Sequence, residues 1–212
     1  MTNQLITLTD PRSAVAEAYR SLYINLSFAD QKQSMHKLLA TSAGAGEGKS
    51  ATLANLAVVA AQLGQRVVLV DCDLRRPQQH ELFGLRNDKG LTSLVASKET
   101  VTSALQAIAD VPGLHVLPSG PLPASPSQVL AARRLDEILA ELAGQVDLLL
   151  LDAPPAAAVA DASVLATKVD GVLLVINAGQ TKRDNARRAK EALEKVNAHI
   201  VGVVLNNVVR NE

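Results

Sequence analysis

The chain has 212 residues, and its 21 basic and 21 acidic side chains give a net charge of zero. Balanced charge argues against the generally basic surface of a nucleic-acid-binding protein. The single cysteine, Cys72, excludes an intrachain disulfide and any iron–sulfur cluster built by one chain alone. No apolar run approaches the ~18 residues of a membrane span, and the first residues lack a signal-peptide pattern, so we expect a cytoplasmic protein without its own span.

The first element predicted along the chain is an amphipathic helix over residues 12–28, with Val15, Leu22 and Leu26 among its apolar positions. The helix precedes the first apolar strand. We therefore expect it to be an addition to one nucleotide-binding domain that spans residues 1–212.

Apolar runs and helical patterns then alternate. The runs predict strands over residues 37–41, 66–71, 114–117, 147–152, 170–177 and 199–207. The patterns predict helices over residues 51–63, 100–109, 126–143 (interrupted near 131) and 182–196, with short pieces near 81 and 91. Ser125 and Gln128 form a predicted capping box, with Pro126 at the first helical position. This alternation predicts an α/β fold: a doubly wound, mainly parallel sheet between two layers of helices.

A glycine-rich stretch, Ser42-Ala-Gly-Ala-Gly-Glu-Gly-Lys-Ser50, lies between the first predicted strand and the following helix. That context is typical of a phosphate-binding loop, whose backbone amides converge on phosphate oxygens. Lys49 would reach the β- and γ-phosphates, and the Ser50 hydroxyl could ligate Mg²⁺. Ala43 stands where the usual motif begins with glycine, a position that tolerates a small residue. The residues predicted to bind nucleotide here are Ala45, Gly46, Glu47, Gly48, Lys49, Ser50 and Ala51.

Acidic residues end two further predicted strands. Asp71 ends the strand over residues 66–71 and Asp73 follows it, while Asp152 ends the strand over residues 147–152. Because the carboxyl ends of parallel strands gather at one edge of a sheet, these acids should lie beside the phosphate loop. Carboxylates there can hold the Mg²⁺ shell or orient the proton of a nucleophile. Arg75 and Arg76 follow the first two acids and could meet phosphate or an acidic peptide.

The phosphate loop, the D-x-D-x-R motif at residues 71–75 and the D-x-P-P motif at residues 152–155 together resemble the bacterial tyrosine kinases of capsule and exopolysaccharide synthesis. The resemblance extends, in the same order, through Glu17-Ala-Tyr-Arg20, Gly90-Leu-Thr-Ser-Leu, Leu117-Pro-Ser-Gly-Pro121 and Gly202-Val-Val-Leu-Asn206. It covers nearly the whole chain. It implies a protein tyrosine kinase that uses ATP and Mg²⁺.

The resemblance also implies roles for single residues. Lys49 would contact the phosphates, while Ser50, Asp73 and Asp152 would serve the metal. Asp71 would orient or deprotonate the attacking tyrosine hydroxyl, which needs such help because its ordinary pKa is ~10. Asn206 would face the adenine.

For assembly, the resemblance implies a homo-oligomer formed through Glu17 and Arg20. It also implies activation by a membrane-bound polysaccharide co-polymerase at the inner face of the membrane. The sequence departs from the family here, since Tyr23 replaces the second arginine of the family's E-x-x-R-x-x-R element. The family's tyrosine-rich tail is not present, and the two tyrosines are Tyr19 and Tyr23.

Three other functions share this fold. A partitioning ATPase switch would carry a lysine where this chain has Gly44. An iron–sulfur carrier is disfavoured because Cys72 is the single thiol and lies between two acids. A nucleotide-binding regulator without phosphotransfer stays open, because the tyrosine-rich tail is missing.

Overall fold

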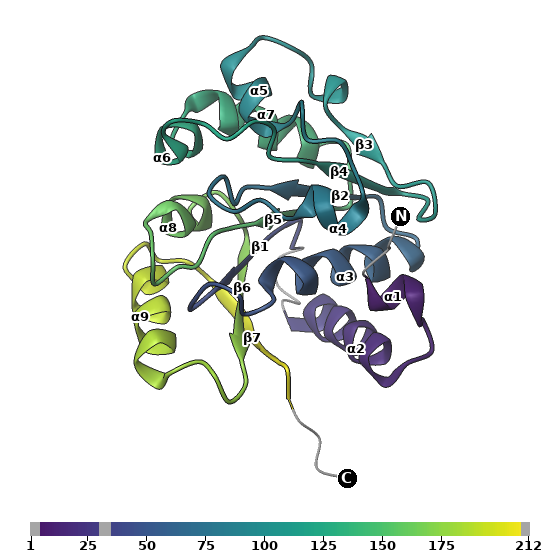
Figure 1. Cartoon of the computed structure of the whole chain (residues 1–212), viewed down its shortest axis with the longest axis vertical. Coiled ribbons are helices and arrows are strands. Elements are labelled where there is room, and N and C mark those ends of the chain that lie inside the picture. Colours follow the sequence, from purple (N-terminus) through teal and green to yellow (C-terminus); the bar gives the residue numbers. More distant parts are fainter. Residues whose placement is uncertain (1–4, 30–34, 209–212) are drawn as a thin grey trace.

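The computed structural model describes residues 5–29 and 35–208 (Figure 1). Within these ranges seven strands form one sheet, in the order β3-β4-β2-β5-β1-β6-β7. All neighbouring strands run parallel except β3 and β4. The strands are β1 Lys37–Ser42, β2 Val67–Asp71, β3 Gln106–Ala107, β4 Leu114–Leu117, β5 Leu148–Asp152, β6 Gly171–Asn177 and β7 Ile200–Asn206. The predicted fold class is confirmed.

Helices cover both faces of the sheet (Figure 1). They are α1 Ile6–Thr9, α2 Ala14–Ala29, α3 Lys49–Gln62, α4 Gln79–Phe83, α5 Leu91–Ala96, α6 Pro126–Leu130, α7 Arg133–Ala143, α8 Asp161–Ala166 and α9 Arg183–Glu194, with a 3₁₀ helix over Val101–Ser103. One apolar cluster joins the sheet to α2 and α3, and the other joins it to α5, α7, α8 and α9. The helix predicted over residues 12–28 is α2.

The core is aliphatic, and the strands alternate between its two halves. On β1, Leu38 and Ala40 face the cluster of α3, whereas Leu39 faces the opposite cluster. Successive side chains of a strand point to opposite faces, so a strand buried on both sides must be apolar throughout. This is why continuous apolar runs located β1, β2, β5 and β6 in the sequence.

Strand register builds one chemically distinct edge. Asp71 of β2 and Asp152 of β5 are paired neighbours at the carboxyl ends of their strands. Strand β1 ends beside them at Ser42 and leads directly into the glycine-rich loop. The predicted convergence of the loop and the strand-end acids on one edge therefore holds in the fold.

Residues 100–109 contradict the predicted helix. The chain instead forms the 3₁₀ turn and then β3, which pairs antiparallel with β4. Val101 and Ala104 are buried on one face of the sheet, whereas Ile108 packs against the cluster on the other face. One straight helix could not supply both contacts, so the helix-like spacing of these apolar residues was misleading.

The predicted capping box is also wrong. Ser125 is the residue before α6 and Pro126 begins that helix, but the Ser125 side chain makes no capping bond. The predicted break near Ala131 is confirmed, because α6 ends at Leu130 and α7 begins at Arg133. Helices α1 and α8 were not predicted.

Candidate phosphate-binding site

The loop between β1 and α3 has the backbone shape of an anion site. Gly46 and Gly48 adopt φ angles of 76° and 82°, in the left-handed region that favours glycine. A Cβ atom on Gly48 would lie 2.0 Å from Nδ2 of Asn206, so any larger residue there would displace that amide. Helix α3 starts at Lys49 and points its N-terminus, with its partial positive charge, toward the loop.

Contacts from distant strand ends hold the loop in this shape. The Glu47 carboxylate accepts hydrogen bonds from the backbone N–H of Ala43 at 2.8 Å and from the Thr181 hydroxyl at 2.6 Å. The Asn206 side-chain amide donates to the Glu47 carbonyl at 3.1 Å. The Glu47 side chain thus holds the loop in place through these two hydrogen bonds. Ala45 and Gly46, at the tip of the loop, remain exposed. Sequence reasoning missed Thr181, which carries no motif.

Lys49 lies at the centre of the acidic residues. Its Nζ is 2.8 Å from Oδ2 of Asp73, 3.3 Å from Oδ1 of Asp152 and 3.0 Å from the Ser50 hydroxyl. Burial alone would lower the pKa of Lys49, but the negative charges of Asp152 and Asp73 outweigh burial and raise it above the ordinary value. The lysine therefore keeps its positive charge in a nearly dry site.

Asp71 is completely buried. Its Oδ1 accepts the backbone N–H of Asp73 at 3.2 Å, and its Oδ2 accepts those of Gln78 and Gln79 at 3.0 and 2.9 Å. Burial, reinforced by the charge of Asp152, raises the pKa of Asp71 well above its usual range. A carboxylate in this environment has a higher proton affinity than an exposed one.

A second ion-pair cluster lies beside the first, and sequence reasoning did not foresee the partners of Arg75 in it. Arg75 donates from Nε to Oδ2 of Asp161 at 2.7 Å, and the Ser127 hydroxyl donates to Oδ1 of the same carboxylate at 2.7 Å. Asp161 is 2% exposed. These bonds tie the chain after β2 to α6 and α8. The two arginines after Asp73 therefore differ in their contacts: the Arg75 side chain pairs with Asp161, whereas the Arg76 side chain is exposed.

The oxygen donors at this edge fit Mg²⁺. In the described part of the chain, no three His, Cys, Asp or Glu side chains form a ready-made metal cluster. Mg²⁺ in nucleotide sites does not require one, since it keeps several waters and binds phosphates with one or two protein oxygens. Ser50, Asp73 and Asp152, which converge on the Lys49 ammonium, supply such oxygens.

The residues predicted to mediate assembly lie elsewhere, on α2. Arg20 donates to Oε2 of Glu17 at 2.8 Å and to the Pro11 carbonyl at 2.6 Å. Tyr19 lies on the same helix, and burial raises the pKa of its hydroxyl. None of the helices in the described ranges combines the length and apolar character needed to cross a bilayer.

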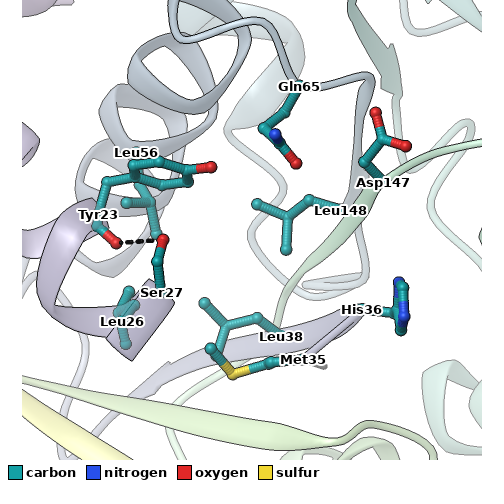
Figure 2. Close-up of a pocket in the computed structure, with 10 residues that line it drawn as sticks. All are labelled: Tyr23, Leu26, Ser27, Met35, His36, Leu38, Leu56, Gln65, Asp147 and Leu148. Carbon is teal, nitrogen blue, oxygen red and sulfur yellow. Dashed lines mark hydrogen bonds between the residues drawn. The ribbon is translucent and has the colours of Figure 1, made fainter. Parts of the chain in front are cut away.

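A cavity of about 530 Å³ lies at the opposite edge of the sheet from the glycine-rich loop. Figure 2 shows Tyr23 and Leu26 of α2 on one side and Leu148 of β5 on the other. Leu38 and Leu148 stand near the starting ends of their strands, whereas the loop follows the finishing end of β1. The cavity is therefore separate from the candidate phosphate site.

A family model described as the NUBPL iron-transfer P-loop NTPase of the ParA group matches residues 33–210. The tyrosine-protein kinase YwqD of Bacillus subtilis is 41% identical over 97% of this chain and 86% of its own length. The tyrosine-protein kinase wzc of Salmonella typhi is 32% identical over 98% of this chain but only 29% of its own length.

Solved structures agree with these matches. The kinase domain of the Escherichia coli tyrosine kinase ETK superposes with a TM-score of 0.95 at 31% identity, over all of this chain and 82% of that one. The septum site-determining protein MinD of Pyrococcus horikoshii, 24% identical, gives a TM-score of 0.69 over 84% of this chain and 72% of that one. The likeness to MinD concerns the fold alone.

Proposed function

The chain belongs to the bacterial tyrosine-protein kinases within the ParA-type P-loop NTPases, and we propose that it transfers the γ-phosphoryl group of ATP to tyrosine hydroxyls. One observation carries the proposal. A phosphate loop, a charged lysine and three carboxylates from two strand ends meet at one buried edge of the sheet. That set can bind a nucleotide, hold its metal and act on an incoming hydroxyl.

Binding begins with the loop. Its backbone amides and the Lys49 ammonium hold the phosphates, and Asn206 stands near the loop on the side proposed for adenine. Ser50, Asp73 and Asp152 would hold Mg²⁺, which when bound offsets negative charge on the phosphates. Lys49 would exchange part of its contact with the carboxylates for contact with phosphate oxygens.

Asp71 is proposed to orient and deprotonate the tyrosine hydroxyl. Three backbone N–H groups fix its carboxylate, so its direction does not depend on the substrate. Its raised pKa favours proton acceptance. Asp73 lies two residues further along, which lets the two acids serve proton and metal separately.

Assembly and location follow as further parts of the proposal. Helix α2 would mediate self-association through Glu17 and Arg20, although their contact within the chain competes with contact to a neighbour. Because wzc is more than three times as long as the matched region, we propose that a membrane-bound polysaccharide co-polymerase supplies the remaining functions. The chain would then act at the cytoplasmic face of the membrane.

A test uses γ-labelled ATP, Mg²⁺ and a tyrosine-containing polymer, with the products analysed by mass spectrometry. The expected result is labelled tyrosine, abolished by omitting Mg²⁺. An added polymer is needed because both tyrosines of the chain, Tyr19 and Tyr23, lie in helix α2 rather than in an extended segment. If ATP is hydrolysed but tyrosine is never labelled, even with the activating segment of a co-polymerase added, the chain is an ATPase switch instead.

A further inference from the structure

Gln79, the first residue of α4, contacts three parts of the site at once. Its side-chain Nε2 donates to Oδ2 of Asp152 at 2.8 Å and to the Ser50 carbonyl at 3.1 Å. Its backbone N–H donates to Oδ2 of Asp71 at 2.9 Å. The residue is completely buried, and no motif marks it in the sequence.

The orientation of this amide is fixed by its partners. A carboxylate and a carbonyl both accept hydrogen bonds, so only the NH₂ end of Gln79 can face them. The opposite end, Oε1, is then buried with no hydrogen-bond partner among the described residues. Buried polar atoms are nearly always satisfied, and an exception needs an explanation. Here the side chain keeps its two bonds to the site and leaves Oε1 unpaired.

The two carboxylate oxygens of Asp152 have different partners. Gln79 occupies Oδ2, and the Lys49 ammonium contacts Oδ1. Rotation of the carboxylate would break both contacts. The same NH₂ group also holds the Ser50 carbonyl in the first turn of α3. One side chain therefore sets the relative placement of two residues proposed to serve Mg²⁺.

We propose that Gln79 is a positioning residue for Mg²⁺-dependent nucleotide binding, which orients Asp152 and aligns it with Ser50. This inference rests on the proposed function. Groups that orient metal ligands typically change metal affinity ~10–100-fold when they are removed. The effect should therefore appear in the Mg²⁺ dependence of binding and leave binding without Mg²⁺ almost unchanged.

The test measures ADP affinity by calorimetry, once with Mg²⁺ and once with EDTA, for the parent chain and two variants. Gln79→Met keeps the length of the side chain without its amide. The expected result is that the gain in affinity from Mg²⁺ falls ~10-fold or more, while affinity in EDTA changes less than ~3-fold. Gln62→Met is the matched control, because Gln62 is exposed, ends α3 and lies outside the site contacts described. It should keep the parent's Mg²⁺ gain.

A role only in packing would lower thermal stability and leave the Mg²⁺ gain intact, which would overturn the inference. An equal loss of that gain in Gln62→Met would overturn it as well. If Gln79→Met does not fold, the same calorimetry is done on Gln79→Ala, and the Gln79 side-chain NH₂ resonance of the parent chain is followed by NMR. That resonance should shift when Mg²⁺ is added to the ADP-bound chain, and no shift counts against the inference. A parent chain that binds no nucleotide at all would overturn the proposed function too.

Discussion

Charged groups lie at both ends of the parallel strands, in very different surroundings. We call the side of the sheet where these strands finish its carboxyl edge, and the side where they start its amino edge. At the carboxyl edge, Lys49, Asp71, Asp73 and Asp152 are each at most 8% exposed. At the amino edge, the Arg66–Asp147 pair has side chains 65% and 35% exposed, and the Lys37–Asp170 pair 32% and 33%. Both edges use the same kinds of residue, so burial is the main difference between them.

Burial changes how much such charged groups contribute to the stability of the fold. An exposed ion pair has a small effect on stability, because water and salt screen it. A buried cluster with three carboxylates and one lysine must give up hydration, and replacing buried ion pairs by apolar residues is often neutral or stabilising. The carboxyl edge therefore has an arrangement that folding alone does not favour. This contrast supports the proposal that the carboxyl edge holds the functional site.

The largest expected effect is on rate. Asp71→Asn should lower phosphotransfer to a tyrosine polymer by ~10²–10⁴-fold, because the hydroxyl loses its proton acceptor. Nucleotide affinity should stay within a few fold. Asp147→Asn at the amino edge should leave the rate unchanged. Initial rates and calorimetry on both variants check this, and a normal rate in Asp71→Asn would remove Asp71 as the base.

Asp152→Asn separates metal handling from proton transfer. It should weaken Mg²⁺-dependent nucleotide binding and lower all turnover together, because a proposed metal oxygen loses its charge. ATP hydrolysis and tyrosine labelling, followed in parallel, would show the joint loss. An effect on tyrosine labelling alone would assign Asp152 a role in proton transfer.

Lys49→Met should weaken ATP binding by an order of magnitude or more, since a charge-assisted contact to phosphate is lost. It should also lower the free energy of unfolding by about 3–5 kcal/mol, because Asp73 and Asp152 lose their buried cation. Urea unfolding measures the second effect. The double variant Lys49→Met with Asp73→Asn should recover part of the lost stability, and no recovery would mean that the carboxylates are not coupled to the lysine.

A smaller loss is expected at the Arg75–Asp161 contact. Asp161→Asn should lower the free energy of unfolding by about 1–2 kcal/mol, because it removes a charge-assisted bond to a partly exposed arginine. Asp88→Asn is the comparison, since the Arg86–Asp88 pair is 84% and 63% exposed. Its urea midpoint should not move. Equal shifts of the urea midpoint in the two variants would show that burial does not determine how much these ion pairs stabilise the fold.

The smallest effect concerns pH at the amino edge. The hydrogen bond and charge of Arg66 lower the pKa of Asp147 from 3.8 to about 2. The contribution of this pair to stability is therefore present above pH ~4 and is lost as the pH falls toward ~2. NMR titration should find the lowered midpoint. Arg66→Gln should raise that midpoint only part of the way to the ordinary range, because the backbone N–H of residue 66 still donates to Asp147. Global stability should change little, because water screens the pair.

The sequence predicted those parts of the molecule that local patterns determine. Continuous apolar runs marked the buried parallel strands, and the glycine spacing marked the loop. The acids at residues 71, 73 and 152 were placed at one edge by the rule for parallel strands alone. These features depend on residues close together in the chain, or on a general property of the sheet.

Features that depend on distant contacts were not predictable in this way. Gln79 looks like an ordinary polar residue until β5 lies beside it, and Asp161 looks like one until the segment after β2 brings Arg75 to it. The segment from Thr100 to Ala109 carried apolar residues at helical spacing, yet tertiary packing divided them between the two faces of the sheet. In this segment the antiparallel pairing of β3 with β4 outweighed the local propensity for helix.

The bond between Asn206 and the Glu47 carbonyl joins residues that are 159 positions apart. The glycine-rich loop is synthesised directly after β1, whereas β7, which completes its support, is the last of the seven described strands to be made. Such long-range contacts form late and slowly. A nascent chain on the ribosome consequently exposes its phosphate loop long before β7 can fasten it. Tight nucleotide binding should therefore require that synthesis has passed residue 206, and cellular ATP would stabilise chains that include β7 over chains that lack it.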